Sequence, residues 1–137
     1  RFQMAVLQGK IQDILALGEV AQIAVGGTDV AYSPAFELKN EKYFGMKLQF
    51  ASSGDVNVKV ELEQSFDAET NAAASDDNFV IPDNKADSPV AEAITDEDVH
   101  ISNYQPNPTP FARFKFTGLS SNDASTVVSV LKLYEVK

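Results

Sequence analysis

The sequence predicts an all-β protein, an antiparallel β-sandwich of jelly-roll type with an N-terminal arm or short helix. Residues 56–66 alternate between two sets of side chains, one apolar apart from Gln64 and the other polar or charged. The apolar members are Val56, Val58, Val60, Leu62 and Phe66. Residues 43–51 and 111–117 alternate in the same way. A period of two is typical of a strand with one face on a core and the other in water, as in antiparallel sheets.

Residues 1–27 are expected to form an arm or helix and a first strand, and residues 28–137 the sandwich domain. Apolar residues recur near the start at steps of three and four, at Met4, Leu7, Ile11, Ile14 and Leu15. That spacing is typical of one helical face, and Gly18 follows as a stop, so a short helix or arm is predicted over residues 10–17. Because the pattern suits a domain core poorly, we expect these five apolar residues to form an interface with a partner on assembly.

Two extended segments are predicted next. The first covers residues 20–25 and ends at Gly26 and Gly27, which are expected to act as a flexible joint. The second covers residues 28–38 and is interrupted at Pro34. Since proline cannot donate to a strand ladder, an edge position or a bulge is expected there.

Residues 43–51 and 56–66 are predicted to pair with each other as a β-hairpin. The four residues between them, 52–55, have the sequence Ser-Ser-Gly-Asp. Two alternating runs joined by such turn residues are typical of a hairpin.

Residues 67–98 carry all of the excess negative charge. The chain has 20 acidic and 11 basic side chains, a net charge of −9, and this stretch holds ten of the acids and one of the bases. Nucleic acid and anionic membrane surfaces are therefore disfavoured as partners, because both need clustered Lys and Arg. The stretch is expected to be an acidic loop, pinned by a short strand at residues 79–81.

Three further strands are predicted near the C-terminus, over residues 99–104, 111–117 and 126–136. The last is apolar on both faces, as expected of a central or interface strand. The expected total is seven to nine strands. No apolar run approaches the roughly 18 residues that a membrane span needs, so no membrane is expected as a partner.

Little in the chain favours catalysis, and we expect no enzymatic activity. His100 is the single histidine, and cysteine is absent from the sequence. A Ser-His-Asp arrangement would need His100 beside a nucleophile on a sharp turn, and the sequence has no Gly-x-Ser-x-Gly element. One histidine without cysteine cannot supply the three nitrogen or sulfur ligands of a zinc site. Gly26 and Gly27 are not followed by the Lys and Ser or Thr of a phosphate-binding loop.

Calcium is the one cofactor for which the sequence offers ligands. The candidates are carboxylates crowded on the acidic loop, namely Asp76, Asp77, Asp96 and Asp98. Hard oxygen ligands of this kind suit calcium. Their spacing does not match a helical calcium loop, and an acidic run that only keeps the surface solvated is the alternative interpretation.

Aromatic residues near strand ends and proline-rich turns allow two interpretations. They are Tyr32, Tyr43, Tyr104 and Phe111. Such rings could stack on sugars, as in sandwich-type carbohydrate-binding modules, or pack loops onto the rim of the core.

Two patches carry a resemblance to a family. One runs from Tyr32-Ser33-Pro34-Ala35-Phe36-Glu37-Leu38 through residues 43–50 to residues 56–66. The other is Pro110-Phe111-Ala112-Arg113-Phe114-Lys115-Phe116-Thr117-Gly118-Leu119, followed by Asn122 and residues 126–135. Together they cover about half of the chain. In this order they resemble the small β-sandwich and jelly-roll structural proteins of tailed bacteriophages, among them capsid decoration or cement proteins. The second patch also resembles a strand of galactose-binding-type jelly rolls.

The resemblance implies a non-enzymatic virion protein that clips onto a shell. It implies a homo-oligomer, with a trimer favoured, a capsid or other virion protein as partner, extended arms that grip neighbours, and a location in the virion. It assigns no individual functional residues. A carbohydrate-binding or adhesin-like module stays open as the alternative; it would use Tyr32, Tyr43, Tyr104 and the loop around Asp96 and Asp98, with calcium as an aid.

Overall fold

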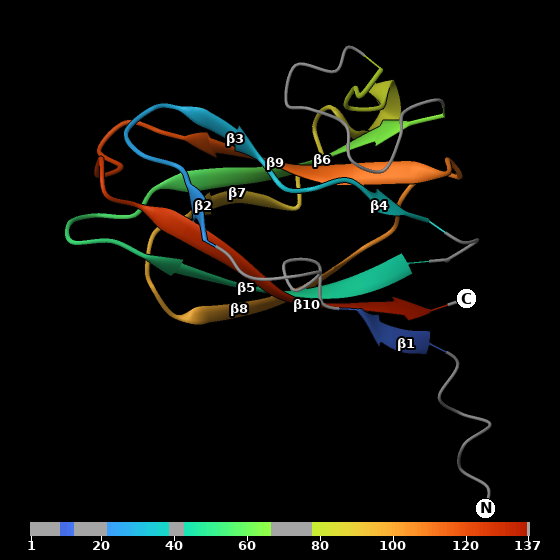
Figure 1. Ribbon diagram of the computed structural model, residues 1–137. Helices are drawn as coiled ribbons and strands as arrows, with labels where there is room; N and C mark the ends of the chain where they lie inside the picture. The colour runs from blue at the N-terminus through green and yellow to red at the C-terminus, as the bar shows by residue number, and fades with distance from the viewer. Residues whose placement is uncertain (1–8, 13–21, 39–42, 67–77, 137) are drawn as a thin grey trace, which may run out of the picture.

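Two antiparallel five-stranded sheets lie face to face in the computed structural model, which describes residues 9–12, 22–38, 43–66 and 78–136 (Figure 1). Sheet A has the order β1-β10-β5-β8, with β2 also paired to β10. Sheet B has the order β3-β9-β6-β7, with β4 also paired to β9. The strands of sheet A are β1 (Gly9–Gln12), β2 (Ile23–Ala24), β5 (Tyr43–Ala51), β8 (Val99–Tyr104) and β10 (Val127–Val136). Those of sheet B are β3 (Val30–Tyr32), β4 (Phe36–Glu37), β6 (Val58–Ser65), β7 (Ala91–Ile94) and β9 (Phe111–Gly118).

The chain passes from one sheet to the other at most of its connections, which is the arrangement of a jelly roll. The predicted fold class is therefore confirmed. The strands expected over 99–104, 111–117 and 126–136 are β8, β9 and β10. The last of them is central, as predicted, because β10 lies between β5 on one side and β1 and β2 on the other. The described residues include no helix of the length and apolarity needed to span a bilayer.

The core lies between the sheets and is built from the alternating residues of the central strands. Its members with at most 2% exposure on these strands are Met46, Leu48 and Phe50 of β5, Val58, Val60 and Leu62 of β6, Ala112, Phe114 and Phe116 of β9, and Val128 of β10. The rings of Phe50 and Phe116 meet edge to face across the two sheets, with centroids 6.4 Å apart. The period-two pattern of the sequence thus identified the core residues of these strands correctly. It was wrong for Phe66, which follows the end of β6 and is 70% exposed.

The hairpin predicted between residues 43–51 and 56–66 is wrong. β5 pairs with β10 and β8 in sheet A, and β6 pairs with β9 and β7 in sheet B. The connection between them crosses the sandwich, where the sheets stand about 10 Å apart, and Val56 enters the core with 4% exposure. Turn residues favour a reversal of direction, but they do not specify whether the returning strand pairs with its predecessor or with more distant strands.

The N-terminal segment contributes strand to sheet A. Residues 10–12, where a short helix or arm was expected, belong to β1, which pairs antiparallel with β10. The helical alternative is therefore wrong for these residues, because Gly9–Gln12 is hydrogen-bonded as an outer strand. The side chain of Ile11 and all of Met4, Leu7, Ile14 and Leu15 lie outside the described part of the chain. Their expected role as an interface stays a prediction.

The acidic connection is more structured than predicted. Its residues 67–77 lie outside the described part. The strand expected at 79–81 is present as a bridge in which Val80 and Gln64 exchange two backbone hydrogen bonds of 2.8 and 3.1 Å. A 3-10 turn, Asp83–Lys85, follows, and then β7, which was not predicted. Because β7 has the sequence Ala-Glu-Ala-Ile, its low β propensity gave no local signal.

Candidate functional site

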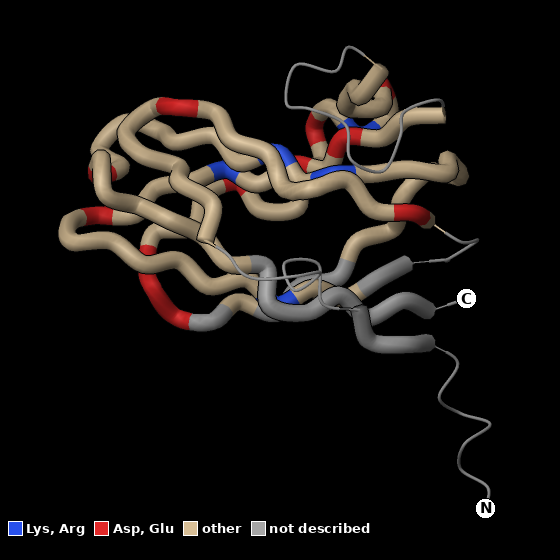
Figure 2. Tube along the Cα trace, in the orientation of Figure 1, with Lys and Arg blue, Asp and Glu red and all other residues tan. Residues whose placement is uncertain are grey.

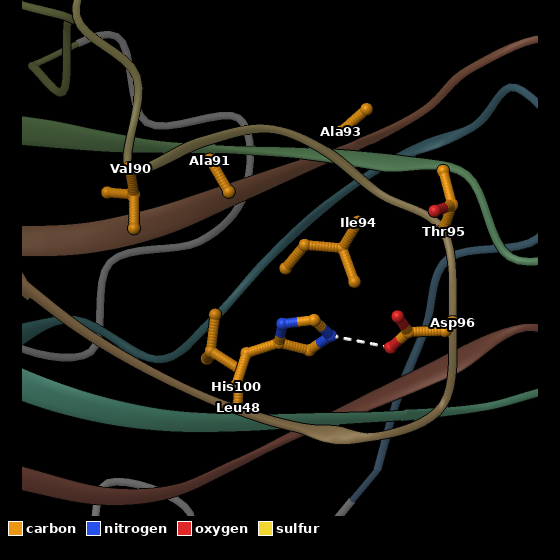
Figure 3. A pocket seen from close by; sticks show the side chains of 8 residues that line it. All are labelled: Leu48, Val90, Ala91, Ala93, Ile94, Thr95, Asp96 and His100. Carbon is orange, nitrogen blue, oxygen red and sulfur yellow. Dashed lines mark hydrogen bonds and ion pairs between the residues drawn. The ribbon is translucent and has the colours of Figure 1, made fainter.

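His100 and Asp96 meet at one lateral opening of the sandwich, between the edge strands β7 and β8. His100 lies on β8 in register with the core residue Leu48. Asp96 lies in the turn that joins β7 to β8, and its Oδ1 is 2.8 Å from His100 Nε2 (Figure 3). The same Oδ1 accepts a hydrogen bond of 3.0 Å from the backbone N–H of Asp98. One carboxylate therefore connects the two ends of the turn.

A hollow of about 300 Å³ adjoins this pair. Its remaining lining is apolar apart from Thr95 and comprises Leu48, Val90, Ala91, Ala93 and Ile94. Figure 3 shows the His100 imidazole between Ile94 and Leu48, with its ring edge directed at Asp96. An apolar hollow beside one polar pair has the general character of a small ligand pocket.

Hydrogen bonding favours the ionised form of Asp96. The contact with His100 lowers the pKa of this carboxyl most, and the N–H of Asp98 lowers it further, against a smaller opposing effect of desolvation. The Asp96 side chain is 53% exposed, so solvent screens its charge. We conclude that the contact organises the β7–β8 turn.

The calcium candidates can be compared with the structure only in part. Asp76 and Asp77 lie outside the described residues. Asp98 meets Asp96 through its backbone N–H rather than its carboxylate. Among the residues that the structure describes, no three His, Cys, Asp or Glu side chains come together as a metal site.

Tyr32 and Tyr104 lie in different sheets. Tyr32 lies on β3 of sheet B, with the guanidinium of Arg113 4.0 Å from its ring centroid. Tyr104 lies at the far end of β8 from the β7–β8 turn; its hydroxyl donates to Ser88 O at 3.3 Å. Burial, and secondarily the charge of Glu61, raises the pKa of Tyr104. The sugar site that would combine these rings with Asp96 is therefore not assembled by the described residues.

Phe111 packs into a small cluster with Ala35 and Phe79, and the side chain of Tyr43 lies outside the described part. This packing agrees with the second interpretation of the aromatic residues, in which they pack loops onto the rim of the core.

Arg113 is a buried cation that sequence analysis did not single out as a site residue. It lies on β9 directly opposite Glu63 of β6, and its Nε donates to Glu63 Oε1 at 2.8 Å. The rings of Tyr32 and Phe79 also lie against the guanidinium, at 4.0 and 4.5 Å from its carbon. Arg113 joins an edge strand and the long acidic connection to the outer face of sheet B. Sequence analysis could not identify this role of Arg113, because it depends on how β6 and β9 are aligned.

The hydrogen bonds of Gln64 explain why a polar residue occupies a position in the apolar row of β6. Its side-chain amide donates to Asn107 O and to Thr109 Oγ1, both at 2.8 Å, and its Oε1 accepts from Asn107 N at 3.0 Å. Gln64 is 2% exposed, so these bonds replace the hydrogen bonds to water that its side-chain amide loses on burial. A second hollow of about 310 Å³ lies beside it. It includes Phe66 and Val80, which are 70% and 57% exposed.

Asn122 holds together three loops at the other end of the sandwich. Its Nδ2 donates to the carbonyls of Val25 and Gly27, both at 2.8 Å. Its Oδ1 accepts from Asn57 N and from Thr126 Oγ1, both at 3.0 Å. Acidic residues gather on the loops at this end, including the β7–β8 turn (Figure 2).

Gly26 is tightly packed and Gly27 forms a left-handed turn, so neither acts as the flexible joint that was expected. A Cβ on Gly26 would lie 2.2 Å from Ala124 O, and Gly27 has φ of 58°. Glycine is therefore required at position 26 by the close approach of Ala124 O, and it is favoured at position 27 by the left-handed φ.

No family model matches the chain, and no curated protein matches it. Among solved structures, the chain is similar to one titled "Carbohydrate-Binding Module CBM36 in complex with calcium and xylotriose". The match has 11% identity and a TM-score of 0.39, and it covers 91% of this chain and 87% of that chain. At this TM-score it contributes no argument about function.

Proposed function

We propose that this protein is a non-enzymatic structural protein of a virion. In the most specific form of the proposal it is an auxiliary subunit that decorates the capsid of a tailed bacteriophage and stabilises the particle by interface burial. Its partners would be a capsid or other virion protein and further copies of itself. The order of the two sequence patches supports the proposal, because it resembles that of small phage sandwich proteins.

The observation that carries the proposal is the use of the buried polar side chains. Arg113 and Glu63 bind each other under two aromatic rings. Gln64 and Asn122 each make several hydrogen bonds to loops. Groups that could take part in chemistry instead fix the loops on a rigid scaffold. Such a scaffold suits a protein that acts through its surface.

The charge distribution supports the same proposal. The excess of negative charge lies within residues 67–98, and the rest of the chain balances ten basic with ten acidic side chains. A net charge far from zero keeps a protein soluble and monodisperse before assembly. A nearly neutral remainder leaves the two sheets free to meet a partner without strong repulsion.

Electron microscopy of particles from the source material tests the proposal. Gold-labelled antibodies against the purified chain should decorate the shells of intact particles, whereas pre-immune serum should not. Adding the purified protein to particles that lack it should raise the temperature at which they disrupt. An absence of gold label on the particles, or an unchanged disruption temperature, contradicts the proposal. Reproducible calcium-dependent binding on a glycan array would favour the carbohydrate-binding alternative instead.

A further inference from the structure

The hollow beside His100 forms because small side chains of β7 face a histidine of β8. β7 has the sequence Ala-Glu-Ala-Ile, and Ala91 and Ile94 both pack toward the core. Ala91 contributes only a methyl group there (Figure 3). On the other side, His100 is in register with the core residue Leu48, so its ring extends into the same space. The result is an apolar space of about 300 Å³ with a polar pair at its mouth.

The polar atoms that face this space are hydrogen-bond acceptors. Asp96 Oδ1 is already engaged by His100 Nε2 and by the backbone N–H of Asp98. Within the described ranges, no hydrogen bond engages Asp96 Oδ2 or His100 Nδ1. Since Nε2 donates to a carboxylate, it carries the proton, and the uncharged ring then presents Nδ1 as an acceptor. Figure 3 shows Nδ1 on the side of Ile94. A ligand at this place therefore needs to bring donors.

The charges around the mouth favour a donor that is a cation. Hydrogen bonds favour the ionised form of Asp96, and the next two residues of the turn, Glu97 and Asp98, are exposed acids. None of the described residues that line the hollow is Lys or Arg. An anionic ligand would meet repulsion without a counter-charge.

We propose that the hollow binds a small apolar molecule that carries a protonated amine. The ammonium group donates to Asp96 Oδ2 and to His100 Nδ1, and the hydrocarbon part lies against the apolar lining. The volume is at the lower end of the range of about 300–1,000 Å³ for ligand pockets, so the hydrocarbon part is about the size of one ring. For a ligand this small we expect a dissociation constant of about 0.1–10 mM. The proposal does not depend on the virion assignment.

Three probes with one aromatic ring each and different polar groups test the proposal: benzylamine, benzyl alcohol and benzoate. His100 is the single histidine, so its ring C–H signals in NMR spectra need no further assignment. The titrations are made at a constant pH of 8, because a protonated ring would offer no acceptor. Benzylamine should shift the His100 signals saturably, benzyl alcohol should bind at least about fivefold more weakly, and benzoate should give no saturable shift up to about 20 mM. Absence of a saturable shift with benzylamine, or equal or tighter binding of either other probe, overturns the proposal.

Two charge variants separate direct contact from general attraction to the acidic turn. Asp96→Asn should weaken benzylamine binding at least about fivefold and leave benzyl alcohol within about twofold. Asp98→Asn is the matched control, because it removes one charge from the same turn and keeps the N–H that donates to Asp96. It should leave benzylamine binding within about twofold, because exposed charges are screened by solvent. Equal weakening by the two variants overturns the proposed contact.

A filling variant tests whether the hydrocarbon part enters the hollow. Ala91→Leu adds three carbons to a residue that lines the hollow, and it should abolish the shift by benzylamine. Circular dichroism verifies folding, and Val90→Phe, which fills the same hollow, replaces this variant if it unfolds. Unchanged binding in a folded filling variant would place the probe outside the hollow and overturn the proposal.

Discussion

Arg113 and Glu63 form an ion pair whose side chains are only 2% and 8% exposed, although both residues lie on the outer face of sheet B. The face is covered there because Phe79, from the acidic connection, and Tyr32, from the edge strand, place their rings against the guanidinium. Burial of both charges makes the pair expensive to break from one side only. It therefore ties the stability of sheet B to the position of a segment about 16 residues away along the chain.

Replacing Arg113 alone should destabilise the fold strongly. Arg113→Met leaves the Glu63 carboxylate buried without its partner, and removing one member of such a pair costs about 3–5 kcal/mol. Urea unfolding at neutral pH measures the loss. Arg113→Met combined with Glu63→Met should recover much of it, because two apolar residues no longer leave a buried charge. Lys115→Met, on the same face of β9, should change stability by no more than about 0.5 kcal/mol. A loss of stability in Arg113→Met that is no larger than that in Lys115→Met would contradict this account.

Asn122 should be equally sensitive, for a different reason. Asn122→Asp keeps the acceptor for Asn57 N but replaces the donor that serves the carbonyls of Val25 and Gly27. Since each buried group left unsatisfied costs about 1–3 kcal/mol, we expect a loss of about 3 kcal/mol in the free energy of unfolding. The exposed neighbour Ser120→Ala is the control and should be close to neutral. A stable Asn122→Asp variant would mean that water replaces the amide.

The sequence predicted the sandwich because the central strands alternate, and alternation directly reflects which side chains face the core. Val58, Val60 and Leu62 were assigned to the core and are at most 1% exposed. The sequence could not predict which strands pair with each other. Residues 43–51 and 56–66 carry the same local signal whether they form a hairpin or lie in opposite sheets, and the difference depends on β8, β9 and β10 far along the chain.

The same limit applied to the candidate site. Asp96 and His100 were named separately, but their contact depends on how the β7–β8 turn closes. The role of Arg113 depends on its alignment with Glu63, and β7 escaped prediction because Ala and Glu give little strand signal. Gln64 was visible as an exception in an apolar row, and an exception of that kind is the signal that could have identified a buried polar contact.

Two glycines on the same side of the sandwich should respond differently to alanine. A Cβ on Gly118 would lie 1.9 Å from Gly27 O, so the backbones must separate. Gly27 has φ of 58° but open space around the added Cβ. We expect Gly118→Ala to lower the free energy of unfolding by about 3 kcal/mol, the upper range for overpacking. Gly27→Ala should lower it by about 1 kcal/mol, the cost of a left-handed residue with a side chain. The reverse order in urea unfolding would exclude this packing.

Asp96 should make stability depend on pH in the acid range. Its folded pKa lies below the ordinary value of 3.8, mainly because of the hydrogen bond with His100. A carboxyl with a lowered folded pKa contributes stability above its unfolded pKa, and that contribution disappears as the pH falls through the folded pKa. Asp96→Asn should therefore be less stable than the unchanged protein at pH 5, and the difference should shrink as the pH falls below 3.8. In a His100→Gln background the difference at pH 5 should shrink. A difference that does not vary between pH 2 and pH 5 would contradict the assignment.

The five apolar residues expected at the N-terminal interface can be tested without assuming their structure. Changing Met4, Leu7, Ile11, Ile14 and Leu15 together to glutamine removes their apolar surface while keeping similar volumes. If they meet a virion partner, the variant should keep its urea midpoint and circular dichroism but fail to bind particles, because only the bound state buries them. If they pack on their own sandwich, the midpoint should fall. Co-sedimentation with particles, measured beside the unfolding curve, separates the two outcomes. Unchanged binding together with unchanged stability would remove these residues from the interface.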